Sequence, residues 1–561
     1  MTENIPQLGA AADPQRIRTW GWLHVQSVPF LILTALSVLV VLSCRVFPSQ
    51  DGPLHLYYAD VTRDLLFHTG HYQSAFVIKH YLAPYSFDTY LLVFLDFIFD
   101  PLLSEKILVC VYLIGFGYGF RYLVKSIAPA NDIVPLLSFL FVFNHSLCMG
   151  FYNFCLGMAM SLWVAGFWVR HSGGLKWNKS LVFAALMILV TLTHAVALAL
   201  CLLFLGLHTA VAMGMRFRNI GGRPVRRIKQ TLALQGRMIL HTAAAASALF
   251  WVLRFGSSDT DARVTAGSVA ERVHEFLLMW SVAPVRDRAY RWSLLAVVAA
   301  AAAAAFFRPW RKRWALSSTG ATSVPLMGAA CLCLSLVLPT RLGGGTSVGG
   351  RFALVGILFV IAAVAVGTPL PVRMARLVAA ATFATSLALF AYLFQVNQRA
   401  LAGIRPFLDA PVLPAGLRAA WVMGDLPELA ELTCAPRFWA GAHYARRSKA
   451  VLVNYGWLDL LYLNLAPRKP GACGYLNCDK MRSCLLDFSA SPQRPDLDLI
   501  ISGSADASAL GGAYGLRRLP FSTVSAGFWA KPGTVTPELR LSIPTDLNRP
   551  SERLGRPNTP Q

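Results

Sequence analysis

The sequence is poor in charged residues. Only 14% of its 561 residues are Asp, Glu, Lys or Arg, about half the share that soluble proteins carry. Hydrophobic residues make up 55% of the chain, and the mean hydropathy is +0.51. This composition excludes an intrinsically disordered chain, which needs low hydrophobicity and high charge, and it excludes a soluble enzyme. Eleven cysteines in this length also exclude a secreted scaffold held together by disulfides.

Acidic residues are scarcer than basic ones. The chain has 28 Asp and Glu against 51 Lys and Arg, which gives a net charge of +23. No RNA- or DNA-binding motif accompanies this excess. Much of it lies in short loops between apolar blocks of about twenty residues, the length that crosses a bilayer. We therefore expect a polytopic α-helical membrane protein whose basic loops orient it and contact membrane lipids, with no nucleic acid as a partner.

The positions of the basic residues predict the orientation of the chain. Residues 1–27 are polar and contain Arg16 and Arg18, so this segment is expected to be cytoplasmic. No cleavage site of small residues follows the first apolar run at 28–47, which we interpret as a transmembrane helix and not as a signal peptide. The strongly basic loops expected on the same side are 215–230, 308–313 and 369–376.

The segment 48–105 is expected to form a long external loop. Its apolar stretch at 90–103 contains Asp96 and Asp100, and carboxylates are costly at the centre of a bilayer. We therefore expect an interfacial helix at 90–103, and the next true span at 106–124.

About eleven membrane spans follow from these assignments. The apolar stretch 180–215 is too long for one crossing, so it is divided between Thr191 and His194. The predicted spans are 28–47, 106–124, 132–148, 151–170, 180–196, 197–215, 231–255, 290–307, 324–339, 351–368 and 377–396. They form a transmembrane domain at 28–396, and their odd number places the C-terminal part outside.

Residues from Asn397 onward differ in character. Pro, Gly, Asp and Arg become more frequent, and the apolar runs shorten to strand length, as at 449–453 and 497–501. We expect a small extracytoplasmic α/β domain at 397–548, followed by a disordered tail at 549–561.

Four cysteines lie in this C-terminal part: Cys434, Cys473, Cys478 and Cys484. Their spacing lacks the C-x2-C pattern of structural zinc sites. Two disulfides are expected in an oxidising outer compartment, and a zinc site is the alternative.

A dense polar cluster follows the first span. Asp51 stands where the chain leaves the bilayer, ahead of a Gly-Pro turn, and residues 54–67 (LHLYYADVTRDLLF) have apolar positions at helical spacing. This pattern predicts an amphipathic helix lying at the membrane face. An Asp before a helix can simply cap its N-terminus, so Asp51 has a structural as well as a catalytic interpretation.

The order of these features resembles the GT-C superfamily of membrane glycosyltransferases. The acid at the outer end of the first span is followed by the amphipathic helix and by residues 86–125 (SFDTYLLVFLDFIFDPLLSEKILVCVYLIGFGYGFRYLVK), which are similar to the loop helix and second span of that superfamily. The resemblance implies a GT-C-like fold. It also implies an enzyme that takes a sugar from a polyprenyl-phosphate carrier and transfers it to a lipid, glycan or protein acceptor on the non-cytoplasmic face. Asp51 then corresponds to the general base.

Such a transfer needs a base. A carboxylate can take the proton that an acceptor hydroxyl loses as it attacks the sugar, while the phosphate leaves as an anion without the second acid that glycosidases use. His55 lies one helical turn from Asp51 and is a candidate substrate contact or a plain interfacial histidine. Asp60 and Asp64 are candidate substrate contacts or part of a solvated helix face. No set of metal ligands stands out, although Asp51 and a neighbouring acid could hold a divalent ion.

Four other external residues are candidate substrate contacts. Asn153 lies in the turn between two spans, where an Asn can also cap a helix. His194 lies at the outer end of a span, where it can also join two helices by a hydrogen bond. Arg341 and Arg351 bracket the sequence RLGGGTSVGGR. Arginines of such late loops hold the lipid phosphate in GT-C enzymes, so the resemblance implies this role here, with interfacial snorkelling as the alternative.

Two other functions remain as alternatives. A transporter or flippase of lipid-linked saccharide needs a polar path through the membrane centre, but the centres of the predicted spans have almost no charges. A non-enzymatic assembly protein would not need Asp51. The basic, Ala- and Arg-rich composition, together with an external domain, suggests the inner membrane of a bacterium.

Overall fold

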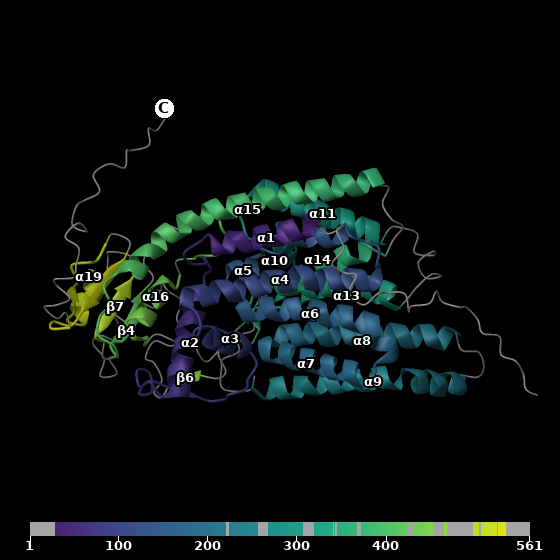
Figure 1. The fold of residues 1–561 in the computed structure, drawn as a ribbon, viewed down its shortest axis with the longest axis horizontal. Helices are drawn as coiled ribbons and strands as arrows, with labels where there is room; N and C mark the ends of the chain where they lie inside the picture. Colours follow the sequence, from purple (N-terminus) through teal and green to yellow (C-terminus); the bar gives the residue numbers. More distant parts are fainter. Residues whose placement is uncertain are drawn as a thin grey trace, which may run out of the picture.

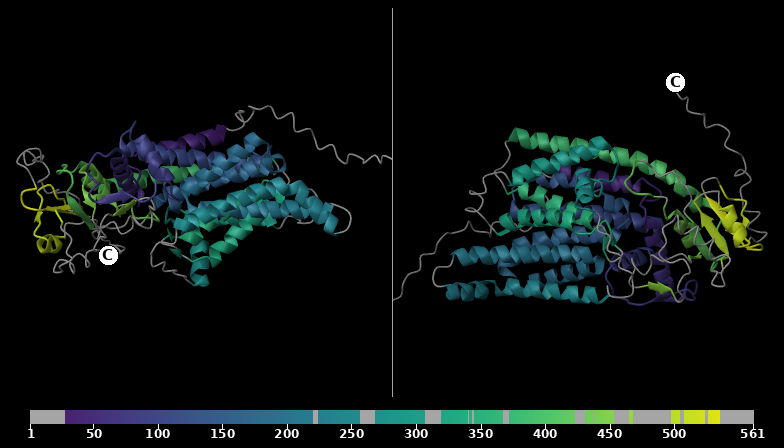
Figure 2. Two further views of the ribbon diagram at one scale, coloured as in Figure 1. Left: turned by 90° about the horizontal axis from the view of Figure 1, so that it is seen from below. Right: turned by 180° about the vertical axis from the view of Figure 1, so that it is seen from behind.

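The computed structural model shows a bundle of long helices with a small sheet domain at one end (Figures 1 and 2). The long helices run along the same axis, as expected where lipid offers the backbone no hydrogen-bond partners and each helix satisfies its own. The structure describes residues 28–219, 224–255, 268–306, 319–339, 341–342, 345–366, 372–422, 431–436, 438–452, 465–467, 497–503, 507–523 and 526–534.

Most helices of the bundle are strongly apolar. They are α1 (Val28–Leu42), α4 (Pro101–Ile127), α6 (Tyr152–His171), α7 (Trp177–Thr193), α8 (Ala195–Asn219), α9 (Pro224–Phe255), α11 (Arg288–Phe306), α13 (Thr319–Val337), α14 (Val348–Val364) and α15 (Val372–Asp409). Among the described residues, α4, α6, α8, α13 and α15 are long and apolar enough to cross a bilayer, and α1, α7 and α14 are apolar but shorter. A multi-pass helical membrane protein is thereby confirmed, while the number of eleven spans stays a prediction.

The span predicted at 132–148 is not a continuous helix. The chain there forms a 3-10 helix, η4 (Val134–Leu140), then an extended stretch, then the four-residue α5 (His145–Cys148). Tyr112 Oη donates a hydrogen bond to the backbone oxygen of Val142 in the extended stretch, at 3.0 Å. Non-helical backbone is tolerated at membrane depth where protein surrounds it, and η4 packs against α1, α4, α14 and α15.

Two other predicted boundaries can be compared with the structure. The division of 180–215 is confirmed, because α7 ends and α8 begins on either side of His194. The interfacial helix predicted at 90–103 is wrong in its extent, because the helix found there, α3, spans Phe87–Leu95. Asp100 then caps α4 by accepting a hydrogen bond from the second residue of that helix. The carboxylate satisfies a free amide at the helix start, so α4 begins earlier than predicted.

Helix α15 joins the bundle to the sheet domain. Its 38 residues correspond to about 57 Å, well beyond the roughly 30 Å of a hydrocarbon core. It passes the predicted domain boundary at 397 without a break, and Figure 1 shows it running from the bundle to the sheet. Near its end, the Phe407 ring lies 5.4 Å from that of Trp421 and 6.0 Å from that of Phe528. The sheet domain therefore begins after this helix.

The C-terminal domain is of the α/β type, as predicted. Its five strands have the order β5-β4-β7-β9-β8. Strands β5, β4 and β7 are parallel to one another, and β9 is antiparallel to both of its neighbours, β7 and β8. Its elements are β4 (Arg418–Val422), α16 (Ala440–Arg447), β5 (Val451–Leu452), β7 (Leu499–Ser502), α19 (Ser508–Ala513), β8 (Arg517–Arg518) and β9 (Gly527–Ala530). The predicted strands at 449–453 and 497–501 correspond to β5 and β7. Two short pairs lie outside this sheet, β1 (Phe76–Ile78) with β6 (Leu465–Pro467) and β2 (Arg341–Leu342) with β3 (Gly345–Thr346).

The loop between α1 and α4 is covered by the C-terminal domain. Its helix α2 (Gly52–Phe67) lies across the ends of the bundle helices in Figure 1 and packs against α16. Tyr57 Oη donates to Ala450 O at 3.1 Å and accepts from Leu452 N at 3.0 Å. Most of α2 is buried. The helix predicted at 54–67 is therefore present, but it has no face open to water, because α16 of the C-terminal domain covers it.

Of the four cysteines in the C-terminal part, the structure describes Cys434. This residue is a buried free thiol in the structure, so the expectation of two disulfides among the four cysteines stays a prediction. Cys473, Cys478 and Cys484 lie outside the described residues, as do the segments 1–27 and 549–561.

Candidate active site

The position of Asp51 is fixed by the turn between α5 and α6. The Asp51 backbone nitrogen donates to Met149 O at 3.1 Å. In the same turn Gly150 has a φ of +77°, and a Cβ there would lie 2.8 Å from the Gly52 nitrogen. Only glycine combines this left-handed conformation with so close an approach. The start of α2 is therefore held tightly against α6.

Asp51 precedes α2 but does not cap it with its side chain. Its carboxylate makes no hydrogen bond to the free amides of the helix, so the capping interpretation is wrong. The backbone oxygen of Asp51 makes the contacts with α2, because it accepts hydrogen bonds from the backbone nitrogens of Leu54 and His55. The residue is 9% exposed, and hydrogen bonds from the side chains of Gln50 and Trp439 favour its ionised form.

Burial raises the pKa of Asp51 from its usual 3.8 to about 6. The charge of His55, the two hydrogen bonds and the charge of Arg351 oppose this rise. The carboxylate is therefore mostly ionised at pH 7, yet close enough to neutrality to take up a proton during a reaction.

His55 pairs with a second acid of the loop. Its Nδ1 lies 2.7 Å from Oδ2 of Asp88, which is wholly buried in the first turn of α3. Burial lowers the pKa of His55, but the hydrogen bond and charge of Asp88, with the charges of Asp51 and Glu105, outweigh it and raise the pKa. A protonated His55 in turn favours the ionised form of Asp51.

Glu105 is a buried acid of the site that sequence reasoning missed. Tyr152 Oη donates to Glu105 Oε1 at 2.6 Å, and Ser49 Oγ lies 2.8 Å from the same Tyr152 oxygen. The Tyr152 ring also packs against the His55 ring, with centroids 4.9 Å apart. A Cβ on Gly52 would collide with the Glu105 carboxylate. The signal in the sequence is an acid directly before an apolar span. The predicted loop 48–105 includes Glu105 as its last residue.

Arg351 supplies a buried cation at the start of α14. It is 5% exposed, and its Nη1 lies 2.8 Å from His194 Nε2. Its guanidinium lies over the rings of Phe151 and Phe154, 4.6 and 5.2 Å from their centroids. Phe151 follows Gly150, whose α-carbon packs against the Asp51 backbone, so the guanidinium over the Phe151 ring lies near the predicted base. The charge of Arg351 accordingly lowers the pKa of Asp51.

Asn153 lies beside this cation at the start of α6. Its Nδ2 donates to Tyr85 O at 3.3 Å, while its Oδ1 is buried with no hydrogen-bond partner among the described residues. Tyr85 has a φ of +68°, which is unusual for a residue with a side chain. Its ring packs edge-on against His194, with centroids 4.6 Å apart. The structure therefore brings Asn153, His194 and Arg351 together.

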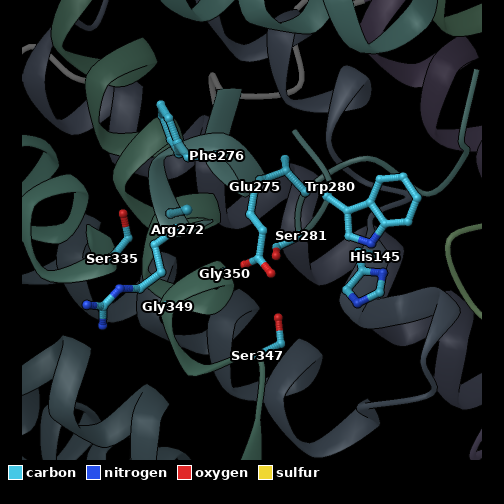
Figure 3. Close-up of a pocket in the computed structure, with 12 residues that line it drawn as sticks. His145, Arg272, Glu275, Phe276, Trp280, Ser281, Ser335, Ser347, Gly349 and Gly350 are labelled. Atoms are coloured by element: carbon cyan, nitrogen blue, oxygen red, sulfur yellow. The ribbon is translucent and has the colours of Figure 1, made fainter. Parts of the chain in front are cut away.

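A cavity of about 210 Å³ opens beside the first turn of α14 (Figure 3). Its other side is formed by α10 (Val269–Leu277) and the residues that follow it. Figure 3 shows the Glu275 carboxylate pointing toward Ser281 and Ser347, with His145 lying below Trp280. The lining residues are His145, Arg272, Glu275, Phe276, Trp280, Ser281, Val282, Ser335, Ser347, Gly349, Gly350 and Ala353. Hydroxyl groups, a carboxylate and an indole ring are suited to a polar, hydroxyl-bearing ligand.

Two of the other predicted substrate contacts, Asp60 and Asp64, are engaged elsewhere. Asp60 is buried and accepts hydrogen bonds from Lys449 Nζ at 2.5 Å. Asp64 is also buried, and its carboxylate accepts from the backbone nitrogen of Tyr72 at 2.9 Å. The alternative prediction, that these acids lie on a helix face open to solvent, is therefore wrong. Both carboxylates are buried and bind other segments of the protein. Arg341 lies in the β2–β3 hairpin.

The site offers no evident metal centre. Within the residues that the structure describes, no group of three His, Cys, Asp or Glu side chains is placed to hold a metal ion. The acids nearest the base, Asp88 and Glu105, already have protein partners, His55 and Tyr152.

Comparison with known proteins gives similar structures but no similar sequences. No protein-family model and no curated protein matches the chain. ArnT from Cupriavidus metallidurans bound to undecaprenyl phosphate is similar with a TM-score of 0.48 and 12% identity, over 91% of this chain and 99% of ArnT. Its apo state gives a TM-score of 0.47 and 12% identity, over 92% and 99%. The mycobacterial arabinofuranosyltransferase AftD gives 0.44 and 12%, over 89% of this chain and 39% of AftD. Similarity at this level does not by itself assign a reaction to this chain.

Proposed function

We propose that this protein is an integral-membrane glycosyltransferase of the GT-C type that moves a sugar from a polyprenyl-phosphate carrier to an acceptor hydroxyl. The proposal rests on one observation: a buried carboxylate, Asp51, and a buried cation, Arg351, share a site at the end of the bundle that faces the sheet domain. A hydroxyl that attacks the anomeric carbon and a phosphate that leaves it need these two groups on opposite sides of that carbon.

Asp51 is the general base. As the acceptor oxygen attacks the anomeric carbon, its proton passes to the Asp51 carboxylate, whose raised pKa of about 6 suits it to the task. His55 and Asp88 act through Asp51, because their ion pair keeps a positive charge near the carboxylate. The bond between the anomeric carbon and the phosphate oxygen breaks, and its electron pair stays on the phosphate. The phosphate leaves as an anion and needs no proton.

Arg351 and His194 bind the carrier phosphate. His194 Nδ1 accepts a hydrogen bond from Val196 N at 3.0 Å. Arg351 Nη1 donates to His194 Nε2 at 2.8 Å, and a neutral imidazole accepts at only one of its two nitrogens, so two donors compete for one acceptor. Arg351 Nε is also buried with no hydrogen-bond partner among the described residues. An anion at this position would accept from these donors. A phosphate does this, and the guanidinium fork matches its oxygens.

The cavity beside α14 takes the polar part of the donor. Its wall includes Gly349 and Gly350, which precede Arg351 in the same helical turn. A sugar attached to a phosphate on Arg351 lies within reach of Ser281, Ser347 and the Glu275 carboxylate. Those groups are suited to sugar hydroxyls.

The proposed orientation places this site on the outer face of a bacterial inner membrane. The basic residues Arg216 and Arg218 at the end of α8 and Arg373 at the start of α15 lie at the ends of these helices away from the sheet domain, and the positive-inside rule assigns such ends to the cytoplasm. The sheet domain is then outside, where it covers α2 and contributes Trp439 to the environment of Asp51.

Sugar transfer by the full chain in lipid nanodiscs tests the proposal. We would supply radiolabelled sugars on undecaprenyl phosphate, the carrier bound in one ArnT structure, and follow release of the carrier phosphate. We expect one donor to be consumed. If lipid-linked sugar instead crosses the bilayer of proteoliposomes without losing its sugar, the protein is a flippase and the proposal fails.

A further inference from the structure

Cys148 and Cys434 lie far apart in the sequence but meet next to the turn that holds Asp51. Cys148 is the last residue of α5, and Cys434 lies in the segment 431–436 that leads to the sheet domain. The Cys434 thiol is within hydrogen-bond reach of the Cys148 side chain. Both residues are buried, with exposures of 9% and 4%, and both are free thiols in the structure.

The two cysteines are held together by contacts on the same short loop. Pro284 O accepts from Cys148 Sγ at 3.7 Å, and it also accepts from the backbone nitrogen of Thr433 at 3.1 Å. One residue further along, Val285 forms an isolated β-bridge with Leu432. The backbone on the N-terminal side of Cys434 is therefore fixed against the same carbonyl that Cys148 contacts.

We propose that Cys148 and Cys434 form a disulfide in the mature protein and thereby join the C-terminal domain to the membrane domain. Two S–H bonds break and one Sγ–Sγ bond forms. The two protons and two electrons pass to the disulfide of a thiol–disulfide exchange protein, whose S–S bond breaks to give a dithiol. The inference rests on the proposed outer orientation of this end of the molecule, where thiols are oxidised, and not on the transferase reaction.

The bond forms during folding. Burial raises the pKa of the Cys434 thiol in the folded protein, and the thiolate is the species that attacks in thiol–disulfide exchange. Exchange at this pair is therefore slow once the segment 431–436 has docked. Because both cysteines are buried, the thiolate of a mild reductant should reach the bond only when the protein is unfolded.

The disulfide would brace the turn that positions the base. Gln50 N donates to Cys148 O at 2.9 Å, and Gln50 Oε1 accepts from Ala435 N at 3.2 Å. Gln50 therefore already connects the neighbours of both cysteines, and its side chain favours the ionised form of Asp51. A covalent bond alongside this connection would keep the segment 431–436 in place over the site.

Peptide mapping of the full chain tests the inference directly. The protein is purified from membranes in excess maleimide, unfolded, digested without reductant and analysed by mass spectrometry. We expect a cross-linked peptide pair that contains Cys148 and Cys434 and separates on reduction. Recovery of Cys148 as the maleimide adduct would overturn the inference, and so would a cross-link from Cys434 to Cys473, Cys478 or Cys484.

The variants Cys148→Ser and Cys434→Ser provide a second measurement. Each should release its partner thiol, so that the unfolded, unreduced protein takes up one more maleimide than the wild type. Cys331→Ser, which removes a buried free thiol of α13, is the matched control and should take up one fewer. If Cys148→Ser and Cys434→Ser both take up one fewer, as the control does, no bond joins them. Because neither measurement uses enzyme activity, their outcome is independent of the proposed function.

Discussion

Arg351 lies close enough to Asp51 for its charge to lower the pKa of the Asp51 carboxyl, although Asp51 directly precedes α2 and Arg351 lies in the first turn of α14. The two residues belong to the loop that follows α1 and to a late helix of the bundle. Their association gives the site a group that accepts protons and a group that binds anions. Transfer of a sugar from a phosphate to a hydroxyl needs both, and the following predictions depend on this pair.

Replacement of Arg351 should weaken binding of the carrier. Arg351→Met removes hydrogen bonds to a charged group, each worth about 1.5–3 kcal/mol, or roughly 10- to 150-fold in affinity. Arg351→Lys keeps the charge but loses the planar fork, so an intermediate loss is expected. Binding of undecaprenyl phosphate to the protein in nanodiscs measures both. Arg121→Lys, at a residue 3.8 Å from Asp132, should bind as the wild type does; equal binding by all variants would exclude the role of Arg351.

The activity should fall in acid with the titration of Asp51. A general base acts only when ionised, so kcat/KM should be level above pH 7 and fall about tenfold per pH unit below a pKa of about 6. A profile recorded from pH 5 to 8 in nanodiscs measures this. An activity that rises as the pH falls below 6 would contradict a base at this position.

Asp51 should lower the stability of the protein at neutral pH. Its folded-state pKa of about 6 lies above the usual 3.8, so the folded protein binds the proton more tightly than the unfolded chain does. The stability from this group is complete below pH 3.8 and is lost as the pH rises through 6, at most about 3 kcal/mol in all. Asp51→Asn should therefore have a higher apparent Tm than the wild type at pH 8, and this gain should shrink toward pH 4.5.

Two comparisons limit this interpretation of the melting curves. Asp132→Asn, at an acid that pairs with Lys125 at 2.7 Å, should show no gain at pH 8. A lower Tm of Asp51→Asn than of the wild type at pH 8 would mean that the carboxylate supports the fold and is not held there at a cost in stability.

Asp60 should join the domains of the protein. It accepts from Lys449 Nζ at 2.5 Å and from Arg63 at 2.9 Å, so Lys449→Met leaves a buried acid with fewer partners. We expect faster proteolysis between α15 and α16 than in the wild type, with donor binding retained. Lys531→Met, at a more exposed pair with Asp498, is the matched control. If Lys449→Met abolishes donor binding but not domain docking, the earlier prediction of Asp60 as a substrate contact is favoured.

The sequence located several residues of the candidate site because they lie at the ends of apolar spans. Asp51, Asn153, His194 and Arg351 are polar residues at span ends that the positive-inside rule assigns to one side. Helices that cross together bring their ends on one side into a common layer, so these residues were predicted on the same face. Their mutual contacts were not predictable, because they depend on how the helices pack.

The rest of the site depends on contacts between distant segments. Trp439 reaches Asp51 from the C-terminal domain, and Glu105 faces Gly52 because Tyr152 holds it. No local pattern encodes these approaches. Hydropathy also does not distinguish a helix from the mixed 3-10 and extended backbone of 132–148, since both are apolar when buried. The covering of α2 by α16 was not predicted either, because it is a contact between segments far apart in the sequence.

The most direct test of the account is sugar transfer by Asp51→Asn beside the wild type. Both proteins are placed in lipid nanodiscs with the donor that the wild type consumes, and donor binding is measured on the same samples. A proton-accepting group contributes about 10²- to 10⁴-fold to a rate. The account predicts a loss of kcat of this size in Asp51→Asn, with donor binding and folding retained. Transfer at the wild-type rate would contradict it and would show that another group accepts the proton.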